Sequence, residues 1–368
     1  MKKKLLVPLL SAFALVFSAC SQAGHRAGLA EGESRVITDV WGRQVRIPLE
    51  VRTIITLGPG APRIAAYLNV MDMLAGSEEY NVRNLTALRD YNPVHHERFR
   101  TLPLVGAGGG SGNNNAFPEA IVMLAPDVII AGFERDAADE LQAQTGIPVV
   151  SVRHRTGLAH ESFYAAVRVF AETVGAQTRG EELLSAIDAY KEDLRQRTFA
   201  IPEDGRPRVY AGAVTFNGRR GMAGTYSHFG PLAAINAYNV ADEAGAEGFI
   251  EIDLEQIIIW DPDVIFLDPG NMDLVNHEYQ VNPSFFRSLR AVQQGRVYSM
   301  PAFNFAGTNI TYALINAYFA GTVLFPQEFA DIDIAEKAGE ILYLFLGENT
   351  FDIMASYGLV YGRLTIGE

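Results

Sequence analysis

Short apolar runs rich in β-branched residues alternate along the chain with longer segments whose apolar positions recur at helical spacing. The first half has strand-like runs at 52–57, 128–131 and 148–152. Helical patterns lie between them, near 61–70 and 135–145. This alternation predicts parallel strands joined by crossover helices, and therefore an α/β fold.

The second half of the chain repeats this plan. Strand-like runs occur at 208–213, 264–267 and 296–300, and a helix is expected from about Phe229. The same alternation of strands and helices returns after a long helical segment, which predicts two lobes of similar construction. The expected boundaries are 35–160 for the first lobe and 201–368 for the second.

One segment of the first lobe recurs in the second. Residues 118–130 read PEAIVMLAPDVII, and residues 254–266 read LEQIIIWDPDVIF. In each copy a glutamate, Glu119 or Glu255, suits the positive end of a short helix, and Pro-Asp ends that helix before a buried strand. The offset of 136 residues fits two homologous lobes. Two glutamates with no duty beyond the helix terminus are the alternative.

The segment between the lobes, 161–200, is predicted to be helical with a break at Gly175. Thr178 and Glu181 have the spacing of a capping box, and apolar residues then recur at helical intervals from Leu183 to Leu194. A long helix therefore joins the lobes, where a Gly/Ser linker would let them move independently.

The amino terminus has the pattern of an export signal. Lys2, Lys3 and Lys4 precede an apolar run over 5–19, which is too short to span a bilayer. The run ends at Cys20 in a sequence similar to a bacterial lipobox, which predicts a lipid anchor; an ordinary signal peptide (1–19) with an incidental cysteine is the alternative. Residues 20–34 are small and polar, as in a flexible linker.

Composition narrows the function. The chain has 368 residues and a net charge of −13, which becomes −16 if the three leader lysines are removed. This charge argues against nucleic-acid binding. One cysteine excludes internal disulfides and thiolate metal cages. A Walker loop and a G-x-S-x-G elbow are both absent from the sequence, so we do not expect an enzyme. An exported α/β enzyme and an adhesive surface lipoprotein remain as alternatives of other classes.

Ligand contacts in such a fold are expected just after strand ends. The candidates are Pro59, Glu79, Tyr80, Phe133, Arg153, His154, Arg155, Phe216, Arg219, Arg220, Tyr226, His228, Asn271, Phe303 and Asn304. The four arginines among them come as one pair on each lobe, which predicts an anionic ligand bound between facing guanidinium groups. The alternative is that they are solvated or paired with nearby acids.

Other candidates suit a metal complex. Tyr80, His154 and His228, together with His95 and His96 of a predicted polar loop, offer oxygen or nitrogen to a partly chelated metal. Phe216, Tyr226, Phe303 and Phe305 could instead wall an organic chelate, with packing of the lobe core as the default interpretation.

The signal with its lipobox, the opening VITD…GR…IP at 36–48, the PEAI…APDVII and LEQI…DPDVIF repeats, and the late 297–303 segment together resemble one known group. This group is the periplasmic substrate-binding proteins of iron-complex, haem and cobalamin ABC importers. The resemblance covers 36–346. It implies two Rossmann-like lobes with central parallel sheets joined by one long α-helix, and a ligand cleft between them.

The resemblance also implies partners. In that family a glutamate on each lobe docks on arginine pockets of the permease, and the matching positions are Glu119 and Glu255. The implied function is capture of a ferric siderophore-type chelate for an inner-membrane permease and its ATPase, with a corrinoid, haem or nickel complex as alternatives. A lipid-anchored monomer of the periplasm and cell envelope is expected, without a cofactor of its own.

Overall fold

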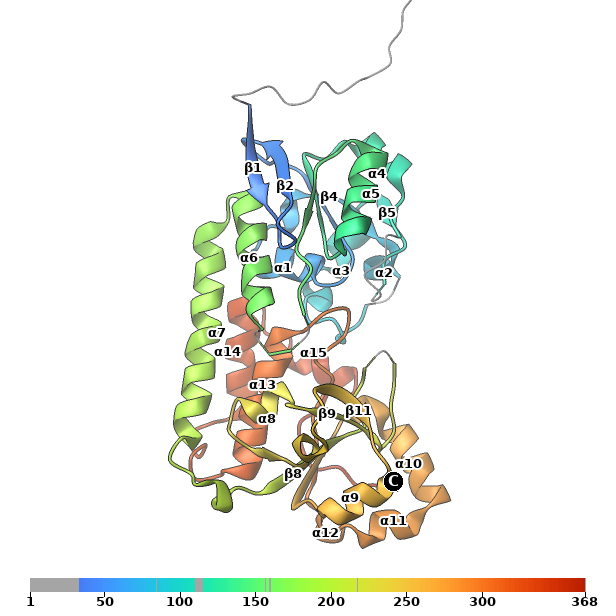
Figure 1. Cartoon of the computed structure of the whole chain (residues 1–368), viewed down its shortest axis with the longest axis vertical. Helices are drawn as coiled ribbons and strands as arrows, with labels where there is room; N and C mark the ends of the chain where they lie inside the picture. The colour runs from blue at the N-terminus through green and yellow to red at the C-terminus, as the bar shows by residue number, and fades with distance from the viewer. Residues whose placement is uncertain are drawn as a thin grey trace, which may run out of the picture.

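The chain folds into two α/β lobes joined along one side by the long helix α7 (Gln177–Thr198) (Figure 1). The computed structural model describes residues 33–83, 85–109, 115–155, 157–158, 160–216 and 218–367. The signal peptide, Cys20 and most of the 20–34 linker lie outside these residues. Ser34, the last residue of the predicted linker, already begins strand β1 (Ser34–Thr38).

The sheet of the N-terminal lobe has five parallel strands in the order β5-β4-β3-β6-β7. They are β3 (Ile54–Leu57), β4 (Leu74–Glu78), β5 (Leu104–Gly106), β6 (Val128–Ala131) and β7 (Val149–Ser151). Every residue of β3 and β6 is buried, as in a parallel sheet covered on both faces. The helices of this lobe are α1 (Ala61–Tyr67), η1 (Met71–Met73), α2 (Glu79–Val82), α3 (Asn92–Arg100), α4 (Pro118–Leu124) and α5 (Arg135–Thr145). Strand β1 pairs with β2 (Gln44–Pro48) in a separate antiparallel hairpin.

The C-terminal lobe has four parallel strands in the order β10-β8-β12-β13. They are β8 (Arg208–Gly212), β10 (Tyr238–Asn239), β12 (Val264–Leu267) and β13 (Val297–Ser299), and β9 (Gly224–Ser227) pairs with β11 (Gly248–Glu251) in an antiparallel hairpin. The helices are η2 (Glu203–Gly205), α8 (Gly230–Ala233), η3 (Val240–Ala244), α9 (Leu254–Trp260), η4 (Pro269–Asn271), α10 (Met272–Val281), α11 (Pro283–Ser288), α12 (Arg290–Gln293), α13 (Ile310–Leu324), α14 (Ile334–Leu346) and α15 (Phe351–Ser356). The helix predicted from about Phe229 is therefore a single turn.

The sequence repeat is a structural repeat. Helices α4 and α9 occupy matching places, and each ends in a left-handed residue before proline, Ala125 (φ 48°) and Asp261 (φ 37°). The aspartate that follows then holds the start of the first strand in the parallel sheet of its own lobe. Asp127 Oδ2 accepts the backbone N–H groups of residues 52 and 53, each at 2.9 Å, and Asp263 Oδ2 accepts that of Arg208 at 2.9 Å. The same side chain thus performs the same structural task in both lobes.

The connection between the lobes is helical and breaks at Gly175, as predicted. Helix α6 (Glu161–Val174) ends at this glycine, whose φ of 78° favours a residue without a Cβ. The predicted capping box is wrong: α7 starts after Ala176 without a side-chain cap, so Thr178 lies inside the first turn. Glu181 instead accepts a hydrogen bond from Arg168 Nε of α6, at 2.9 Å.

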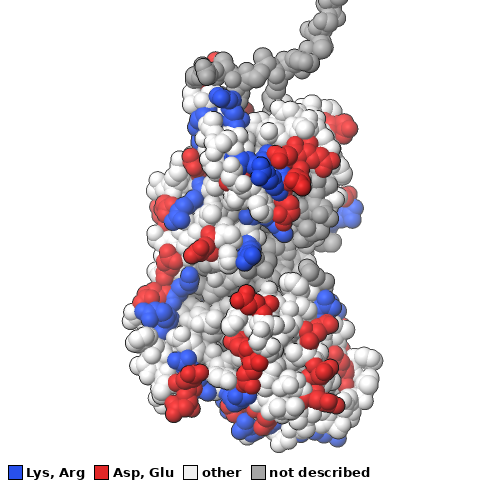
Figure 2. Space-filling model, viewed as in Figure 1, with Lys and Arg blue, Asp and Glu red and all other residues white. Residues whose placement is uncertain are grey.

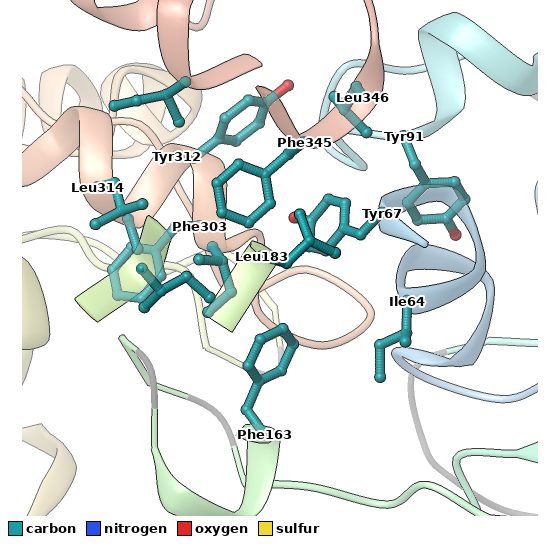
Figure 3. Packing of buried hydrophobic residues seen from close by; sticks show 14 of the residues in the cluster. Ile64, Tyr67, Tyr91, Phe163, Leu183, Phe303, Tyr312, Leu314, Phe345 and Leu346 are labelled. Carbon is teal, nitrogen blue, oxygen red and sulfur yellow. The ribbon is translucent and has the colours of Figure 1, made fainter. Parts of the chain in front are cut away.

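A buried apolar cluster behind the cleft is shared by both lobes (Figure 3). Ile64 and Tyr67 come from α1, Leu183 from α7, Tyr312 from α13 and Phe345 from α14. The rings of Tyr67 and Phe345 pack edge-on with 5.1 Å between their centroids. The C-terminal helices therefore complete the core of the first lobe, which ties the two lobes together at the back.

Candidate ligand-binding cleft

The candidate site lies between the lobes, where loops that follow the carboxyl ends of both sheets meet. Figure 2 shows a waist at this level, with acidic and basic side chains spread over both lobes. Backbone N–H groups of the N-terminal lobe donate across it. Gly60 N–H donates to the Ala306 carbonyl at 3.2 Å, and Gly157 N–H donates to Thr308 Oγ1 at 2.9 Å. The loop after β13 is therefore the part of the C-terminal lobe that closes on the N-terminal lobe.

A buried ionic network supports this loop from behind. Arg63 of α1 forms an ion pair with Asp90 at 2.8 Å, and both side chains are almost completely buried. The guanidinium also reaches the other lobe, donating to the carbonyls of residues 305 and 306 at 3.0 Å and to Asn309 Oδ1 at 2.7 Å. Asp90 Oδ2 accepts from Thr311 Oγ1 at 2.7 Å and from the hydroxyl of Tyr67. This network fixes the loop after β13 relative to α1.

An aromatic pair spans the two lobes at the cleft. Tyr80 of α2 stacks on Phe305, with 6.5 Å between ring centroids and an interplanar angle of 19°. The guanidinium of the buried Arg89 lies 4.3 Å from the centroid of the Tyr80 ring. An arginine over an aromatic face is a favourable cation–π arrangement, and it brings positive charge to this wall.

Glu78, at the end of β4, is an acid buried in the N-terminal wall. Its side chain accepts the Gly58 N–H at 2.9 Å. Burial raises the pKa of this carboxyl to about 7, against the opposing effects of that hydrogen bond and of the nearby Arg89 charge. Near neutral pH this acid is therefore partly protonated.

His154 lies against the loop that follows β3. Burial lowers its pKa to about 4, so the ring is neutral at pH 7. Its Nδ1 is 3.1 Å from the Val152 carbonyl; a proton on Nδ1 satisfies that contact and leaves the Nε2 lone pair available. Gly60 has a φ of 84°, and a Cβ there would lie 2.4 Å from the imidazole Cε1. Only glycine lets the ring approach this closely.

The C-terminal wall contains a small pocket of about 20 Å³, room for roughly one water molecule. Its lining comprises Ala211, Gly212, Val214, Thr215, Phe229, Phe266, Asp268, Met300, Pro301, Ala302, Phe303 and Asn304. Asp268 accepts a 2.6 Å hydrogen bond from Thr215 Oγ1, and burial raises its pKa.

Comparison with known proteins decides the family. The family model described as "Periplasmic binding protein" matches residues 54–302, more than half of the chain. The chain belongs to the periplasmic binding protein family. Such proteins are the solute-binding components of ABC importers and carry a transported ligand rather than a cofactor. The family implies a periplasmic location and work with an inner-membrane permease and its ATPase.

Individual relatives differ in what they bind. The chain is 25% identical to the molybdate-binding protein MolA of Haemophilus influenzae, over 84% of this chain and 90% of MolA. It is 24% identical to the Fe(3+)-citrate-binding protein YfmC of Bacillus subtilis, over 49% of this chain and 55% of that protein.

Solved structures share the fold. A periplasmic solute-binding protein of Veillonella parvula superposes with a TM-score of 0.66 at 19% identity, covering 89% of this chain and 97% of that one. Molybdate-bound MolA gives a TM-score of 0.63 at 23% identity, with coverage of 86% and 98%. The predicted α/β architecture of two lobes and a joining helix is thus confirmed.

The four predicted arginines do not have equal surroundings in this binding protein. Three have acidic partners: Arg153 with Glu134 (3.2 Å), Arg220 with Glu251 (3.5 Å), and Arg219 with Asp273. Arg155 is exposed and has no ion pair among the described residues. Only this arginine therefore presents an uncompensated charge.

Several other predicted residues are engaged with their own lobe. Asn271 is buried, donates to the Ala213 carbonyl at 2.7 Å and accepts from Arg219 Nε at 3.0 Å. Asn304 accepts from Thr308 Oγ1 at 2.8 Å, which shapes the loop after β13. His228 is exposed beside Asp242, with 3.7 Å between Nδ1 and Oδ2. Through these contacts the three side chains hold loops of the C-terminal lobe in place.

Three of the four predicted aromatic residues, Phe216, Tyr226 and Phe303, form one group of edge-on and tilted rings with Phe229 in the C-terminal lobe, whereas Phe305 stacks on Tyr80. Phe216 packs against Tyr226, Tyr226 against Phe229, and Phe229 against Phe303, with centroid distances of 6.0, 6.2 and 5.4 Å. His95 and His96 lie on helix α3, so the predicted loop location is wrong. No cluster of three or more His, Cys, Asp or Glu side chains suited to a metal ion occurs in the described ranges.

Stability should depend on pH through Glu78. The carboxyl binds its proton more tightly in the folded state (pKa about 7) than in the unfolded state (about 4.3), so the free energy of unfolding falls as pH rises across this interval. Between pH 4.5 and pH 8, we expect the free energy of unfolding of the wild type to fall by up to about 3 kcal/mol relative to that of Glu78→Gln. Urea unfolding of both proteins measures this difference.

The comparison isolates Glu78 because both proteins keep His154, whose lowered pKa acts in the opposite sense: it reduces stability as pH falls from about 6.5 to about 4. A difference between the two proteins that stays constant from pH 4.5 to pH 8 would show that the buried carboxyl remains ionised.

Proposed function

We propose that this binding protein captures an anionic metal species for import. The observation that carries the proposal is Arg155, which is exposed, lies two residues before the Gly157–Thr308 contact between the lobes and has no ion pair among the described residues. The Arg89 guanidinium lies over the Tyr80 ring of the N-terminal lobe. Guanidinium groups bind oxyanions and carboxylates through charge-assisted hydrogen bonds.

Two ligands of this class are the leading candidates. A ferric chelate is the ligand expected from the sequence, and Fe(3+)-citrate, an anionic carboxylate chelate, is named for one relative. Molybdate, a compact metal oxyanion, is named for the relative that matches 84% of this chain. Tyr80 and the neutral His154 offer the oxygen and nitrogen that a chelated ferric ion can take as additional ligands. A small oxyanion needs only the guanidinium and N–H donors.

Calorimetric titration with sodium molybdate, ferric citrate and sodium sulfate tests this proposal. We expect one of the first two to bind with micromolar or tighter affinity and Arg155→Gln to raise its Kd by about tenfold or more, since a charge-assisted hydrogen bond contributes about 1.5–3 kcal/mol. Arg168→Gln is the matched control, because Arg168 pairs with Glu181 on the helices behind the cleft.

Native mass spectrometry of protein purified from its host provides the independent check. A bound haem, corrinoid or free nickel ion would contradict the anionic class, as would an Arg155→Gln affinity equal to that of the wild type.

We also propose how the protein is held and recognised. Lipidation of Cys20 would tether the mature chain, as a monomer, to a membrane surface. No helix in the described part of the chain is long and apolar enough to cross a membrane. Glu119 and Glu255 are exposed in the first turns of α4 and α9, and neither has an ion pair among the described residues, so both are free to pair with basic groups of the permease.

A further inference from the structure

Residues 304–308, at the tip of the loop between β13 and α13, are here named the cleft strap. The base of the strap is closed within the C-terminal lobe: Asn309 N–H donates to the Phe303 carbonyl at 2.7 Å, and Thr308 Oγ1 donates to Asn304 Oδ1 at 2.8 Å. Both Phe303 and Asn309 are buried. The strap is therefore a short projection between two fixed points.

The N-terminal lobe contacts every residue of the strap after Asn304. The hydrogen bonds and ring contacts are those of Phe305 with Tyr80 and Arg63, of Ala306 with Gly60 and Arg63, and of Thr308 with Gly157. At Gly307 the approach leaves no room for a side chain, since a Cβ there would lie 3.0 Å from Arg63 Nη1 and 3.2 Å from the Gly60 nitrogen. One short loop thus forms a continuous contact across the cleft.

The backbone of the strap is strained in this position. Ala306 has a φ of 52°, and the next residue, Gly307, has a φ of 91°. The left-handed region is unfavourable for a residue with a Cβ, and such a residue persists only where its surroundings fix it. At Ala306 the surroundings are the Gly60 N–H and the Arg63 guanidinium of the other lobe. If these contacts broke, the strap could relax away from the N-terminal lobe.

Movement of the strap would not leave a buried charge unpaired. The Arg63 side chain is 1% exposed, and its partners Asp90 and Asn309 both lie outside the strap. Only the hydrogen bonds from Arg63 to the carbonyls of residues 305 and 306 would be exchanged for water. The large cost of separating a buried ion pair is therefore avoided.

We propose that the cleft strap is a gate, closed in this structure, that opens as one unit to admit and release the ligand. The inference rests on the proposed function and adds the moving part of the cleft. The lobes are joined behind the cleft, where Tyr67 packs against Phe345, so passage of a ligand requires movement of a loop. Short loops that close over ligands move about a few residues at their ends, which here are Phe303 and Asn309.

Hydrogen exchange of the ligand-free protein, followed residue by residue by NMR, tests whether the strap opens as a unit. Thr308→Val keeps the shape of the side chain but removes the acceptor of the Gly157 N–H. We expect this variant to raise the exchange rate of the Gly60 amide, at the other end of the strap, about two- to tenfold, the factor that corresponds to one lost hydrogen bond. Thr308→Ser retains the hydroxyl and is the matched control.

Phe305→Ala provides a second variant, because it removes the half-buried ring that contacts Tyr80. This variant should raise the exchange rates of both the Gly60 and the Gly157 amides. The Gly132 amide is the reference, since it donates to the Leu57 carbonyl at 2.8 Å inside the N-terminal lobe. Its exchange rate should equal that of the wild type in every variant.

Stopped-flow binding kinetics test whether this opening admits the ligand. The probe is sodium molybdate or ferric citrate, whichever the wild type binds. When the open state is rare, the rates of entry and of exit are both proportional to its population. Thr308→Val should therefore raise the association and the dissociation rate constants by about two- to tenfold each, and the Kd should change less than either. A loop that only contacts the bound ligand would change the dissociation rate alone.

The outcomes distinguish the gate from the proposed function. If the wild type binds neither anion, the proposed function fails, and the exchange measurement alone then supports or overturns the opening of the strap. Wild-type exchange of the Gly60 amide in both variants overturns it. A parallel rise at Gly132 also overturns it, because the lobe would then open as a whole. If ligand binds and Thr308→Val leaves the association rate unchanged, the strap is not a gate.

Discussion

Replacing Asp90 by alanine is expected to lower the free energy of unfolding by about 3–5 kcal/mol, because the change leaves the Arg63 guanidinium buried without its counter-charge. The carboxylate also accepts hydrogen bonds from Tyr67 and Thr311, so its removal strands donors from both lobes. Urea unfolding followed by circular dichroism measures the effect, and the loop after β13 should lose hydrogen-exchange protection with it.

The pair Arg197–Asp331, whose carboxylate lies at the surface, provides the control for Asp90→Ala. It has good geometry, at 2.6 Å, but the Asp331 side chain is 65% exposed, so Asp331→Ala should cost no more than about 1 kcal/mol. The double variant Arg63→Met with Asp90→Ala should be more stable than Asp90→Ala alone, because it removes the uncompensated charge. Equal losses for Asp90→Ala and Asp331→Ala would refute the claim that the buried network holds the lobes together.

The fold was predictable where the sequence carries strong local signals. Strands β6 and β12 are continuous apolar runs that begin with β-branched residues, and both have the predicted bounds, as does helix α5. Strand β4 was missed because LAGSE contains no β-branched or aromatic residue. Its strand conformation comes from pairing on both edges, with β3 and β5, which no local pattern reports.

The site was predictable only in outline. The rule that ligands lie after strand ends led to the loops that meet between the lobes, but it selected Tyr80 and overlooked Glu78, which is the last residue of its strand. Arg63 was also overlooked, since its partners Ala306 and Asn309 lie more than 240 residues away along the chain. A charged residue is predicted to lie at the surface unless the partner that neutralises it is known.

Replacing Gly132 by alanine should disrupt the floor of the cleft. Gly132 follows β6, and a Cβ on it would lie 2.0 Å from the Pro59 carbonyl oxygen, a backbone atom that cannot rotate away. The methyl group must therefore displace the loop after β3, which carries Gly60 and its contacts with Ala306 and His154. We expect a loss of about 1–3 kcal/mol in stability and a rise of about tenfold or more in the Kd for the anion that the wild type binds.

Gly362→Ala is the matched control, because a Cβ at Gly362 meets no atom within 4 Å and the backbone there is not left-handed. This variant should be as stable as the wild type to within about 0.5 kcal/mol and should bind ligand normally. Urea unfolding measures the stability of the wild type and of both variants, and calorimetric titration measures their Kd, so that the two effects are separated. If Gly132→Ala is destabilised but binds with the wild-type Kd, the loop after β3 does not contact the ligand, and the binding site must lie closer to the C-terminal wall.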